Sequence, residues 1–325
     1  TENVVITSHE QETRVFTDDS GQLRVNVSPE DARRLKTAGL VRYSDFGAVG
    51  DGKTDDINAI AATHAFANRH GLSVRADDDA TYYIGGKERT AVIQTNTDFG
   101  AAEFIIDDTD VENRRASVFE VSSSVKPFTP DGINYLKRNQ EKINVNLPGP
   151  SLITVTNSNV KRYIRYGPNQ NSGSSQTDIF IVDSKGDVDM DAPIIWDFDT
   201  ITDISALPID EDTLKITGGR FTTIANQAES RYTYYSRNIA IRRSNVLVDG
   251  LEHRVTGEKD HGAPYGGFIR ISDCANVTVQ NSILTGHKTY RTVGSRGDSV
   301  SMGSYDLLVN RALNVSFINC SQTND

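Results

Sequence analysis

Two glycine-containing stretches near the end of the chain gather the side chains best suited to acid–base chemistry. Residues 257–267 and 286–298 flank one apolar segment, Phe268 to Thr285. Because residues 287–297 hold three Lys or Arg, one His and no acid, they form a positive island in a chain of net charge −10. The candidate side chains are His261, Tyr265, His287, Lys288, Tyr290, Arg291, Arg296 and Asp298.

This combination suits β-elimination on a uronic-acid polymer. That reaction needs a cation to neutralise the uronate carboxylate, a base to remove the C5 proton and an acid to protonate the leaving oxygen. The assignments are His287 or His261 as the base, Arg291 or Lys288 as the carboxylate clamp, and Tyr265 or Tyr290 as the acid. The predicted activity is that of a polysaccharide lyase, and the predicted partner is an acidic polysaccharide.

Two other functions stay open. Glycoside hydrolysis needs two carboxylates at a set separation, and Asp260, Asp273 and Asp298 are the candidates for it. The triplet Gly286-His287-Lys288 resembles one element of polygalacturonase-type hydrolases, but their other elements are absent in order. The third function is a non-catalytic tailspike or adhesin, which binds glycans without cleaving them.

Composition limits the partners and the compartment. With 34 Lys and Arg against 44 Asp and Glu, nonspecific binding to nucleic acid is disfavoured, because such binding depends on phosphate neutralisation. No apolar run is long enough to span a membrane. The start of the chain lacks a signal peptide, so we expect a processed, secreted, periplasmic or cell-surface protein. Cys274 and Cys320 are expected to be buried thiols rather than a disulfide.

No cofactor is predicted. The acidic run Asp183 to Asp191 lacks the glycine position and closing glutamate of an EF-hand loop, so calcium remains an option without assignable ligands. A second basic window, Lys161 to Tyr166, alternates cationic and aromatic residues. We interpret it as a solvated strand face, with an extension of a substrate groove as the alternative.

A repeat organises the second half of the chain. Four segments begin with an apolar-x-apolar step and then turn at Gly or Asn, with starts 32, 31 and 38 residues apart. They are Leu214-Lys-Ile-Thr-Gly-Gly, Val246-Leu-Val-Asp-Gly-Leu, Val277-Thr-Val-Gln-Asn-Ser and Val315-Ser-Phe-Ile-Asn-Cys. Asn245, Asn276 and Asn314 directly precede the last three. This period, with asparagine at a corner, predicts a solenoid whose stacked turns share one apolar interior.

The segment 43–86 predicts a different local structure. It reads Tyr43-Ser-Asp-Phe-Gly-Ala-Val-Gly-Asp-Gly-Lys-Thr-Asp-Asp-Ile57, then an alanine-rich stretch to Gly71, then Asp79-Ala-Thr-Tyr-Tyr-Ile-Gly-Gly86. The glycines supply positive φ, Thr54 is expected to cap the helix, and Gly71 is expected to end it. The pattern resembles the N-terminal cap of the pectate-lyase-type right-handed β-helix superfamily. The resemblance implies an all-β fold, a right-handed parallel β-helix (solenoid) with a short N-terminal helical cap, and a carbohydrate theme.

Three parts are therefore expected. Residues 1–42 form N-terminal strands and a short helix that begins after Ser28 and ends near Gly39; residues 43–86 form the cap; and residues 87–325 form a β-helix body with long loops. Within that body, residues 126–149 are a polar, proline-containing excursion, interpreted as a long loop or arm. Because solenoid ends need covering, we expect further chain or a partner over the turn near Val315 to Cys320.

Overall fold

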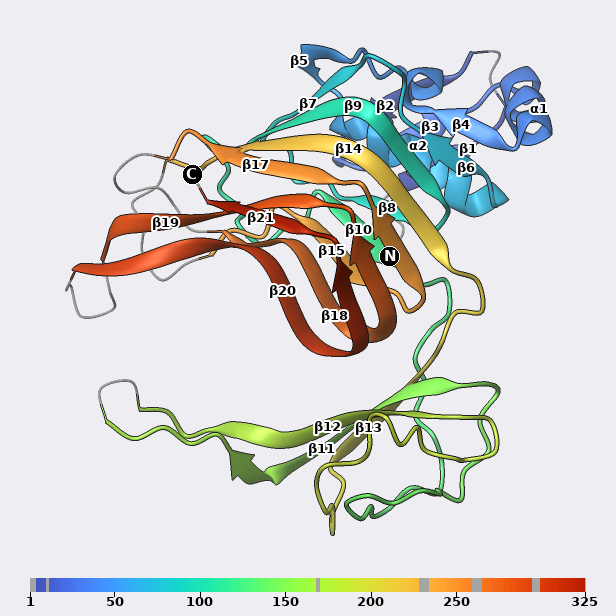
Figure 1. Ribbon diagram of the computed structural model, residues 1–325. Coiled ribbons are helices and arrows are strands. Elements are labelled where there is room, and N and C mark those ends of the chain that lie inside the picture. The colour runs from blue at the N-terminus through green and yellow to red at the C-terminus, as the bar shows by residue number, and fades with distance from the viewer. Residues whose placement is uncertain are drawn as a thin grey trace.

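The computed structural model describes residues 4–9, 12–167, 170–227, 234–258, 265–293 and 299–324, with backbone alone at 287–293, 299–303 and 324. It is mostly β, with two α-helices. Figure 1 shows parallel strands stacked in the middle of the view, both helices at the upper right and a separate small sheet below. No helix in the described residues is long and apolar enough to cross a membrane.

The N-terminal strands and first helix form where the sequence predicts them. Strands β1 (Val4–Thr7), β2 (Arg14–Thr17) and β3 (Leu23–Asn26) make a three-stranded sheet in the order β1-β3-β2. Helix α1 (Pro29–Ala38) begins after Ser28, whose side chain accepts a hydrogen bond from the Asp31 amide. Its C-cap Gly39 has φ 67°, as expected for a left-handed helix end.

The segment after α1 follows the predicted order of short elements but corrects one cap. Its elements are β4 (Leu40–Arg42), the 3-10 helix η1 (Tyr43–Phe46), β5 (Asp51–Asp55), α2 (Ile57–His70), β6 (Ser73–Arg75) and β7 (Thr81–Ile84). The expectation that Thr54 caps α2 is wrong: Asp56 is the N-cap residue. The Thr54 amide and hydroxyl instead donate to Asp51, because that carboxylate closes its own turn.

Helix α2 buries its small-residue face and covers a sheet edge. Ile57, Ile60, Ala61 and His64 on this face are almost fully buried. At the other end of the helix, the Asn68 amide donates to Val92 O at 2.7 Å and its carbonyl accepts from Gln94 N at 3.0 Å. The side chain thereby replaces a neighbouring strand along β8, which would otherwise expose unpaired backbone groups.

The main body is a coil of parallel strands with three faces. Its strands are β8 (Ala91–Ile93), β9 (Thr97–Asp107), β10 (Phe119–Ser122), β14 (Leu214–Ile224), β15 (Ile239–Arg242), β16 (Val246–Asp249), β17 (Glu252–Thr256), β18 (Gly266–Gln280), β19 (Ile283–Val293), β20 (Ser299–Ile318) and β21 (Ser321–Asn324). One face stacks β8, β10, β15 and the first parts of β18 and β20. A second stacks parts of β9 and β14 with β16, β18 and β20. The third stacks β7, β9, β14, β17, β19 and β21.

The repeat predicted from sequence is confirmed residue by residue. Leu214 pairs with Val246, Val246 with Val277, and Val277 with Val315, all in parallel strands. The corner asparagines also stack as expected. Asn276 Nδ2 donates to Asn245 Oδ1 at 3.0 Å, and Asn314 Nδ2 donates to Asn276 Oδ1 at 3.0 Å. All three have φ between 51° and 58°, a backbone that asparagine tolerates better than most residues.

Aromatic rings fill the interior of the coil. Phe104 and Phe221 stack with ring centroids 4.6 Å apart, and Phe99 and Phe119 meet them edge-on. Cys274 is buried and Cys320 is half-buried, and both are free thiols as predicted. At the last turn the cover is incomplete, since Val309 and Phe317 remain 42% and 40% exposed. The expectation that something covers this turn stays a prediction.

The predicted excursion is larger than residues 126–149 and has its own core. Between β10 and β14 the chain leaves the coil and builds an antiparallel sheet, β12-β11-β13, from β11 (Ser151–Arg162), β12 (Ser174–Val182) and β13 (Asp203–Pro208). Its buried residues form a separate hydrophobic cluster that includes Leu136, Phe180 and Phe198. The two ends of this inserted sheet meet where Ser123 Oγ donates to Asp210 Oδ1 at 2.7 Å and Arg243 pairs with the same oxygen at 2.9 Å.

Candidate functional site

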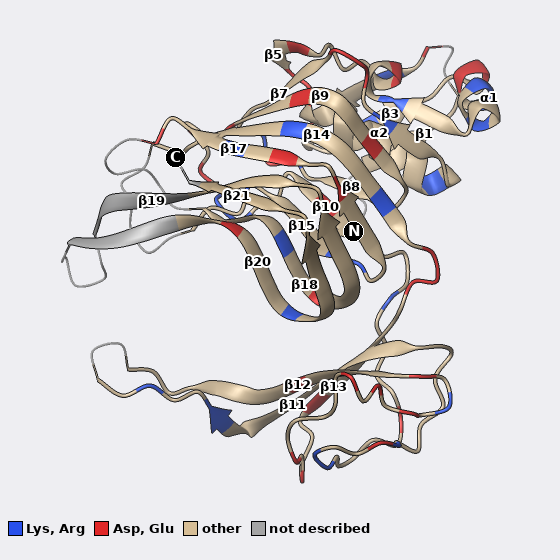
Figure 2. Cartoon of the chain, viewed as in Figure 1, with Lys and Arg blue, Asp and Glu red and all other residues tan. Residues whose placement is uncertain are grey.

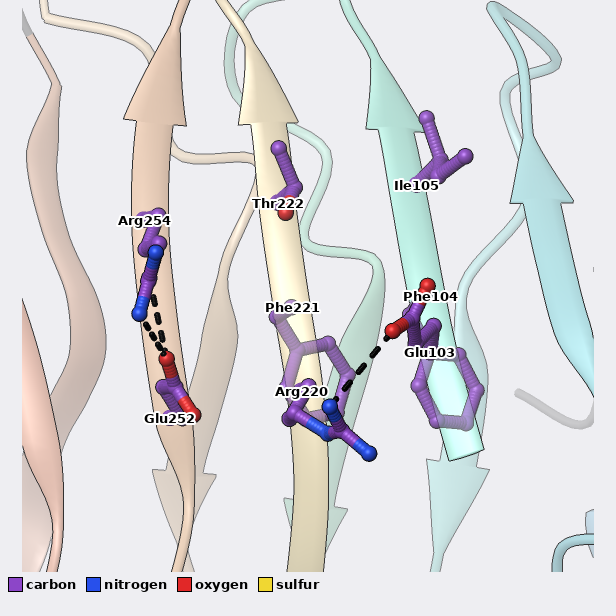
Figure 3. A pocket seen from close by; sticks show the side chains of 8 residues that line it. All are labelled: Glu103, Phe104, Ile105, Arg220, Phe221, Thr222, Glu252 and Arg254. Atoms are coloured by element: carbon purple, nitrogen blue, oxygen red, sulfur yellow. Dashed lines mark hydrogen bonds and ion pairs between the residues drawn. The ribbon is translucent and has the colours of Figure 1, made fainter. Parts of the chain in front are cut away.

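The outer surface of the third face carries a charged depression of about 270 Å³. It crosses the three neighbouring strands β9, β14 and β17 (Figure 3). Its lining residues are Glu103, Phe104, Ile105, Arg220, Phe221, Thr222, Glu252 and Arg254. The depression therefore combines two carboxylates and two guanidinium groups on a rigid three-strand support.

Strand alternation explains why these side chains meet. Phe104 and Phe221 point into the core, so their neighbours Glu103 and Arg220 must point outward. The register then aligns the charges, because Arg220 pairs in the ladder with Glu103 on one side and with Glu252 on the other. Neighbouring strands lie about 4.8 Å apart, which places the backbones of the two glutamates about 10 Å apart across Arg220.

The charges are paired with each other but remain available to a ligand. Arg220 Nη1 lies 3.6 Å from Glu103 Oε1, and Arg254 Nη2 lies 2.6 Å from Glu252 Oε1. The side chain of Glu103 is 54% exposed, whereas that of Glu252 is 25% exposed. Exposed ion pairs contribute only about 0–1 kcal/mol to stability, so these groups exchange partners at little cost.

A third carboxylate continues this row of outward residues. Asp107 lies four positions after Glu103 on β9, and its Oδ2 accepts a hydrogen bond from Tyr83 Oη at 2.9 Å. Partial burial acts to raise the pKa of Asp107, but hydrogen bonds from Thr109 and Tyr83 outweigh it and hold that pKa below its usual value. Burial and the nearby Asp107 raise the pKa of Tyr83 to about 12. Asp107 is therefore an ionised acceptor and Tyr83 a neutral donor at neutral pH.

Tyr265, predicted as a catalytic acid, lies in a buried network. It is 6% exposed, and its hydroxyl donates to Asp108 Oδ2 at 2.9 Å and accepts from the Asn226 amide at 3.1 Å. Burial, followed by the charge of Asp108, raises the pKa of Tyr265 well above its ordinary value. In this arrangement Tyr265 ties the start of β18 to the end of β9.

The same network joins several of the loops that leave the third face. Asp108 forms an ion pair with Arg237, whose Nη2 also donates to Gly85 O at 3.0 Å. Asn226 Nδ2 donates to the carbonyl oxygens of Asp108 at 2.8 Å and Val111 at 3.0 Å. These bonds hold segments far apart in the sequence together at one edge of the coil.

The other predicted residues are described only in part. Strand β19 carries His287, Lys288, Tyr290 and Arg291, and the structure describes these four residues by their backbone alone. His287 pairs in antiparallel register with Ser304 of β20. This stretch is a strand up to Val293 rather than a loop from Gly286. The predicted residues outside the described chain are Asp260, His261, Arg296 and Asp298.

The backbone nevertheless brings the two predicted stretches together. The Tyr265 amide donates to Ser304 Oγ at 3.0 Å, and Ser304 is the ladder partner of His287. By contrast, Asp273, a hydrolase candidate, lies at a corner of the coil and pairs with Arg311 at 2.7 Å. The catalytic roles of all these residues stay predictions.

Sequence reasoning missed the carboxylates of the depression. A signal for them was present, because the strands Glu103-Phe-Ile-Ile, Arg220-Phe-Thr-Thr and Glu252-His-Arg-Val each begin with a charged residue before an inward ring. Of the six histidines, His64 and His253 are buried in the core. Within the described ranges, no three His, Cys, Asp or Glu side chains group in a way that would hold a metal ion.

Comparison with known proteins gives similarity to solved structures alone, since no family model and no curated protein matches the chain. The tailspike protein gp49 from Pseudomonas phage LKA1 is 14% identical with a TM-score of 0.48, over 86% of this chain and 46% of that one. The gp54 tailspike of Acinetobacter baumannii bacteriophage AP22, solved with a capsular saccharide, is 12% identical with a TM-score of 0.43, over 94% and 53%. PfbA, a surface adhesin of Streptococcus pneumoniae, is 15% identical with a TM-score of 0.35, over 86% and 57%. The chain spans about half the length of these structures.

Proposed function

We propose that this protein is a polysaccharide-degrading enzyme that acts at or outside the cell surface and hydrolyses glycosidic bonds on the third face of its coil. The observation that carries the proposal is the placement of Glu103 and Glu252 in register on either side of Arg220. Glycoside hydrolysis uses two carboxyl groups on opposite sides of the scissile bond. The backbones of Glu103 and Glu252 lie about 10 Å apart, which is nearer to the carboxyl separation of inverting enzymes, about 6.5–9.5 Å, than to the roughly 5 Å of retaining ones.

In this mechanism one glutamate protonates the leaving oxygen while the other activates a water on the opposite face of the sugar. Arg220 and Arg254 would orient hydroxyl or carboxylate groups of the glycan, since guanidinium donors bind carboxylates in a fixed fork.

A second candidate reaction is β-elimination on a uronate-containing glycan. It is favoured by the antiparallel pairing of β19 with β20, which carries the positive island of Lys288 and Arg291 with His287 next to the Tyr265 loop. His287 would remove the C5 proton and Arg291 would hold the carboxylate. In either reaction we place residues 43–86 as the cap of a right-handed coil, the hand that parallel crossovers adopt in about 98% of cases.

The test is incubation of the protein with a panel of acidic and neutral polysaccharides. New reducing ends without absorbance from an unsaturated uronate are the expected result. Reducing ends accompanied by that absorbance would replace hydrolysis by β-elimination. Binding without either signal would leave a glycan-binding tailspike or adhesin, and neither binding nor cleavage across the panel would reject the proposal.

A further inference from the structure

The β11–β12 arm of the inserted sheet, residues 157–167 and 170–177, is a cationic and aromatic surface that the proposed reactions do not use. It contains Lys161, Arg162 and Arg165 but no Asp or Glu. Figure 2 shows the contrast, with basic residues alone on this arm while acidic residues are spread over the rest of the chain. Strand β12, which continues from the arm to Val182, has contacts with β20 of the coil.

The three cations lack carboxylate partners in the described part of the chain. Lys161 Nζ bonds to Ser175 Oγ at 3.0 Å, and Arg162 bonds through Nε and Nη2 to Gln176 Oε1 at 3.2 and 2.9 Å. These partners are neutral, whereas exposed basic residues elsewhere, such as Arg220 and Arg311, pair with acids. In a protein of net charge −10, this local excess of positive charge favours an anionic ligand.

Two tyrosines on the arm present open ring surfaces. Tyr163 is 76% exposed and Tyr166 is 87% exposed. Tyr163 has φ 55°, a left-handed backbone conformation that residues with a Cβ disfavour. Exposed aromatic rings are the surfaces on which sugar rings stack, and a tyrosine also offers a hydroxyl for hydrogen bonding.

The base of the arm is held in a defined shape. The Arg162 guanidinium lies over the Trp196 ring, 4.3 Å from its centroid, and Gln176 Nε2 donates to Asp197 O at 2.8 Å. Gly173 allows the two strands to approach, because a Cβ there would lie 2.4 Å from Arg162 O. The aromatic and cationic groups therefore project from a built support.

We infer that the β11–β12 arm is a second binding site for an anionic glycan, in which Tyr163 and Tyr166 stack on sugar rings while Arg165 and Lys161 contact carboxylate or sulfate groups. The inference rests on the proposed function for the identity of its ligand as a polysaccharide. Two sites on one polymer raise the apparent affinity, because binding at the second becomes intramolecular.

The experiment measures binding to polygalacturonate, alginate and hyaluronate, with dextran as the neutral comparison. We expect the Tyr163→Ala/Tyr166→Ala double variant to bind the acidic polymers about tenfold more weakly than the wild type, because it loses both rings on which sugars would stack. Tyr135→Ala is the matched control, since Tyr135 is 65% exposed in the same insertion, before β11 and outside the arm. Arg165→Ala should flatten the salt dependence of binding, whereas Lys185→Ala, on an exposed turn away from the arm, should not.

Several outcomes would overturn the inference: no binding to any acidic polymer, equal binding to dextran, or a double variant that binds as tightly as the wild type. A change in oligomeric state in the double variant, seen by light scattering, would make the arm a contact between copies instead. Cleavage assays separate this inference from the proposed function. If the double variant binds more weakly but the wild type cleaves no polymer, the proposed function is rejected and the arm remains a binding site. If the wild type cleaves a polymer but the double variant binds as tightly as the wild type, the proposed function stands and the binding site on the arm is rejected.

Discussion

Asp108 and Arg237 form an ion pair of 2.8 Å in which both side chains have 1% or less of their surface exposed. They come from segments 129 positions apart, and their contact fixes the loops beside the candidate site. A buried pair of this kind is costly to break, because removal of one partner leaves the other charged and without water.

Arg237→Ala should therefore lower the free energy of unfolding by about 3–5 kcal/mol. Denaturant titration measures this, with Lys142→Ala as the control, since the pair of Lys142 with Asp187 is exposed and worth at most about 1 kcal/mol. An Arg237 variant as stable as the control variant would mean that the network does not hold the loops.

Stability should fall as the pH drops below about 6.5, because two core histidines cannot accept protons in the folded state. Burial lowers the pKa of His64 and of His253 to about 3. The unfolded chain takes up protons near pH 6.5 while the folded chain does not, so the contribution is present above that pH and lost below it. By pH 5 each histidine costs about 2 kcal/mol.

His253→Gln tests this dependence, because an amide can still hydrogen-bond to Thr223, which contacts His253 Nε2 at 2.9 Å. Unfolding midpoints between pH 5 and pH 8 should show a shallower loss of stability in the variant than in the wild type. Parallel curves for the two proteins would contradict the assignment.

Asn276→Ala should destabilise the coil by about 3–4 kcal/mol. The change removes two ladder bonds worth about 1 kcal/mol each and places alanine at φ 58°, which costs another 1–2 kcal/mol. Asn276→Gly is the matched control, since it removes the same bonds but tolerates that backbone. If both variants lose equal stability, backbone strain plays no part at this corner.

Glu103→Gln and Glu252→Gln should each reduce hydrolysis by about two to four orders of magnitude, because each removes one of the two acid–base groups. Their folding should be unchanged, as both side chains are exposed or half-buried. Turnover of a cleaved polysaccharide is the measurement, and Glu30→Gln on the exposed side of α1 is the control. Full activity in both site variants would exclude hydrolysis at this depression.

If β-elimination is the reaction, His287→Ala should lower turnover by about two to four orders of magnitude without unfolding the protein. Arg291→Ala should chiefly weaken the binding of charged substrate. Arg291→Lys should restore only part of that binding, because lysine lacks the bidentate fork of arginine. Absorbance of the unsaturated product follows both. Unchanged turnover in His287→Ala would remove this residue as the base.

The solenoid was predictable because its signal is local. An apolar-x-apolar step after Asn245, Asn276 or Asn314 specifies a strand and its corner within about five residues, and aligning the three asparagines gives the register. The helix boundaries at Ser28, Gly39 and Gly71 are local in the same way. Thr54 is not the cap because strand β5 runs on to Asp55 and the helix begins only at Ile57, while the Thr54 amide and hydroxyl donate to Asp51 within a local turn.

The site was less predictable because it depends on long-range register. Glu103 and Glu252 are placed beside Arg220 only once residues 123–213 are recognised as a segment that leaves the coil and returns to it. The strands of the coil and of the inserted sheet both alternate buried and exposed residues, so this alternation does not show which strands pair. Tyr265 reads as an outward loop residue until Asp108, 157 positions away, is placed beside it.

The inserted sheet also affects how the chain folds. It separates Asp98 from its neighbour Thr217 by 119 positions, whereas later corners are joined across 31 or 38. Because loop-closure entropy grows only with the logarithm of length, this interruption costs just about 1 kcal/mol more than an ordinary turn. Its kinetic effect is larger, since long-range pairings form slowly. The later turns are therefore expected to assemble first, and β9 to join them once the contact between Ser123 and Asp210 has brought the ends of the insertion together.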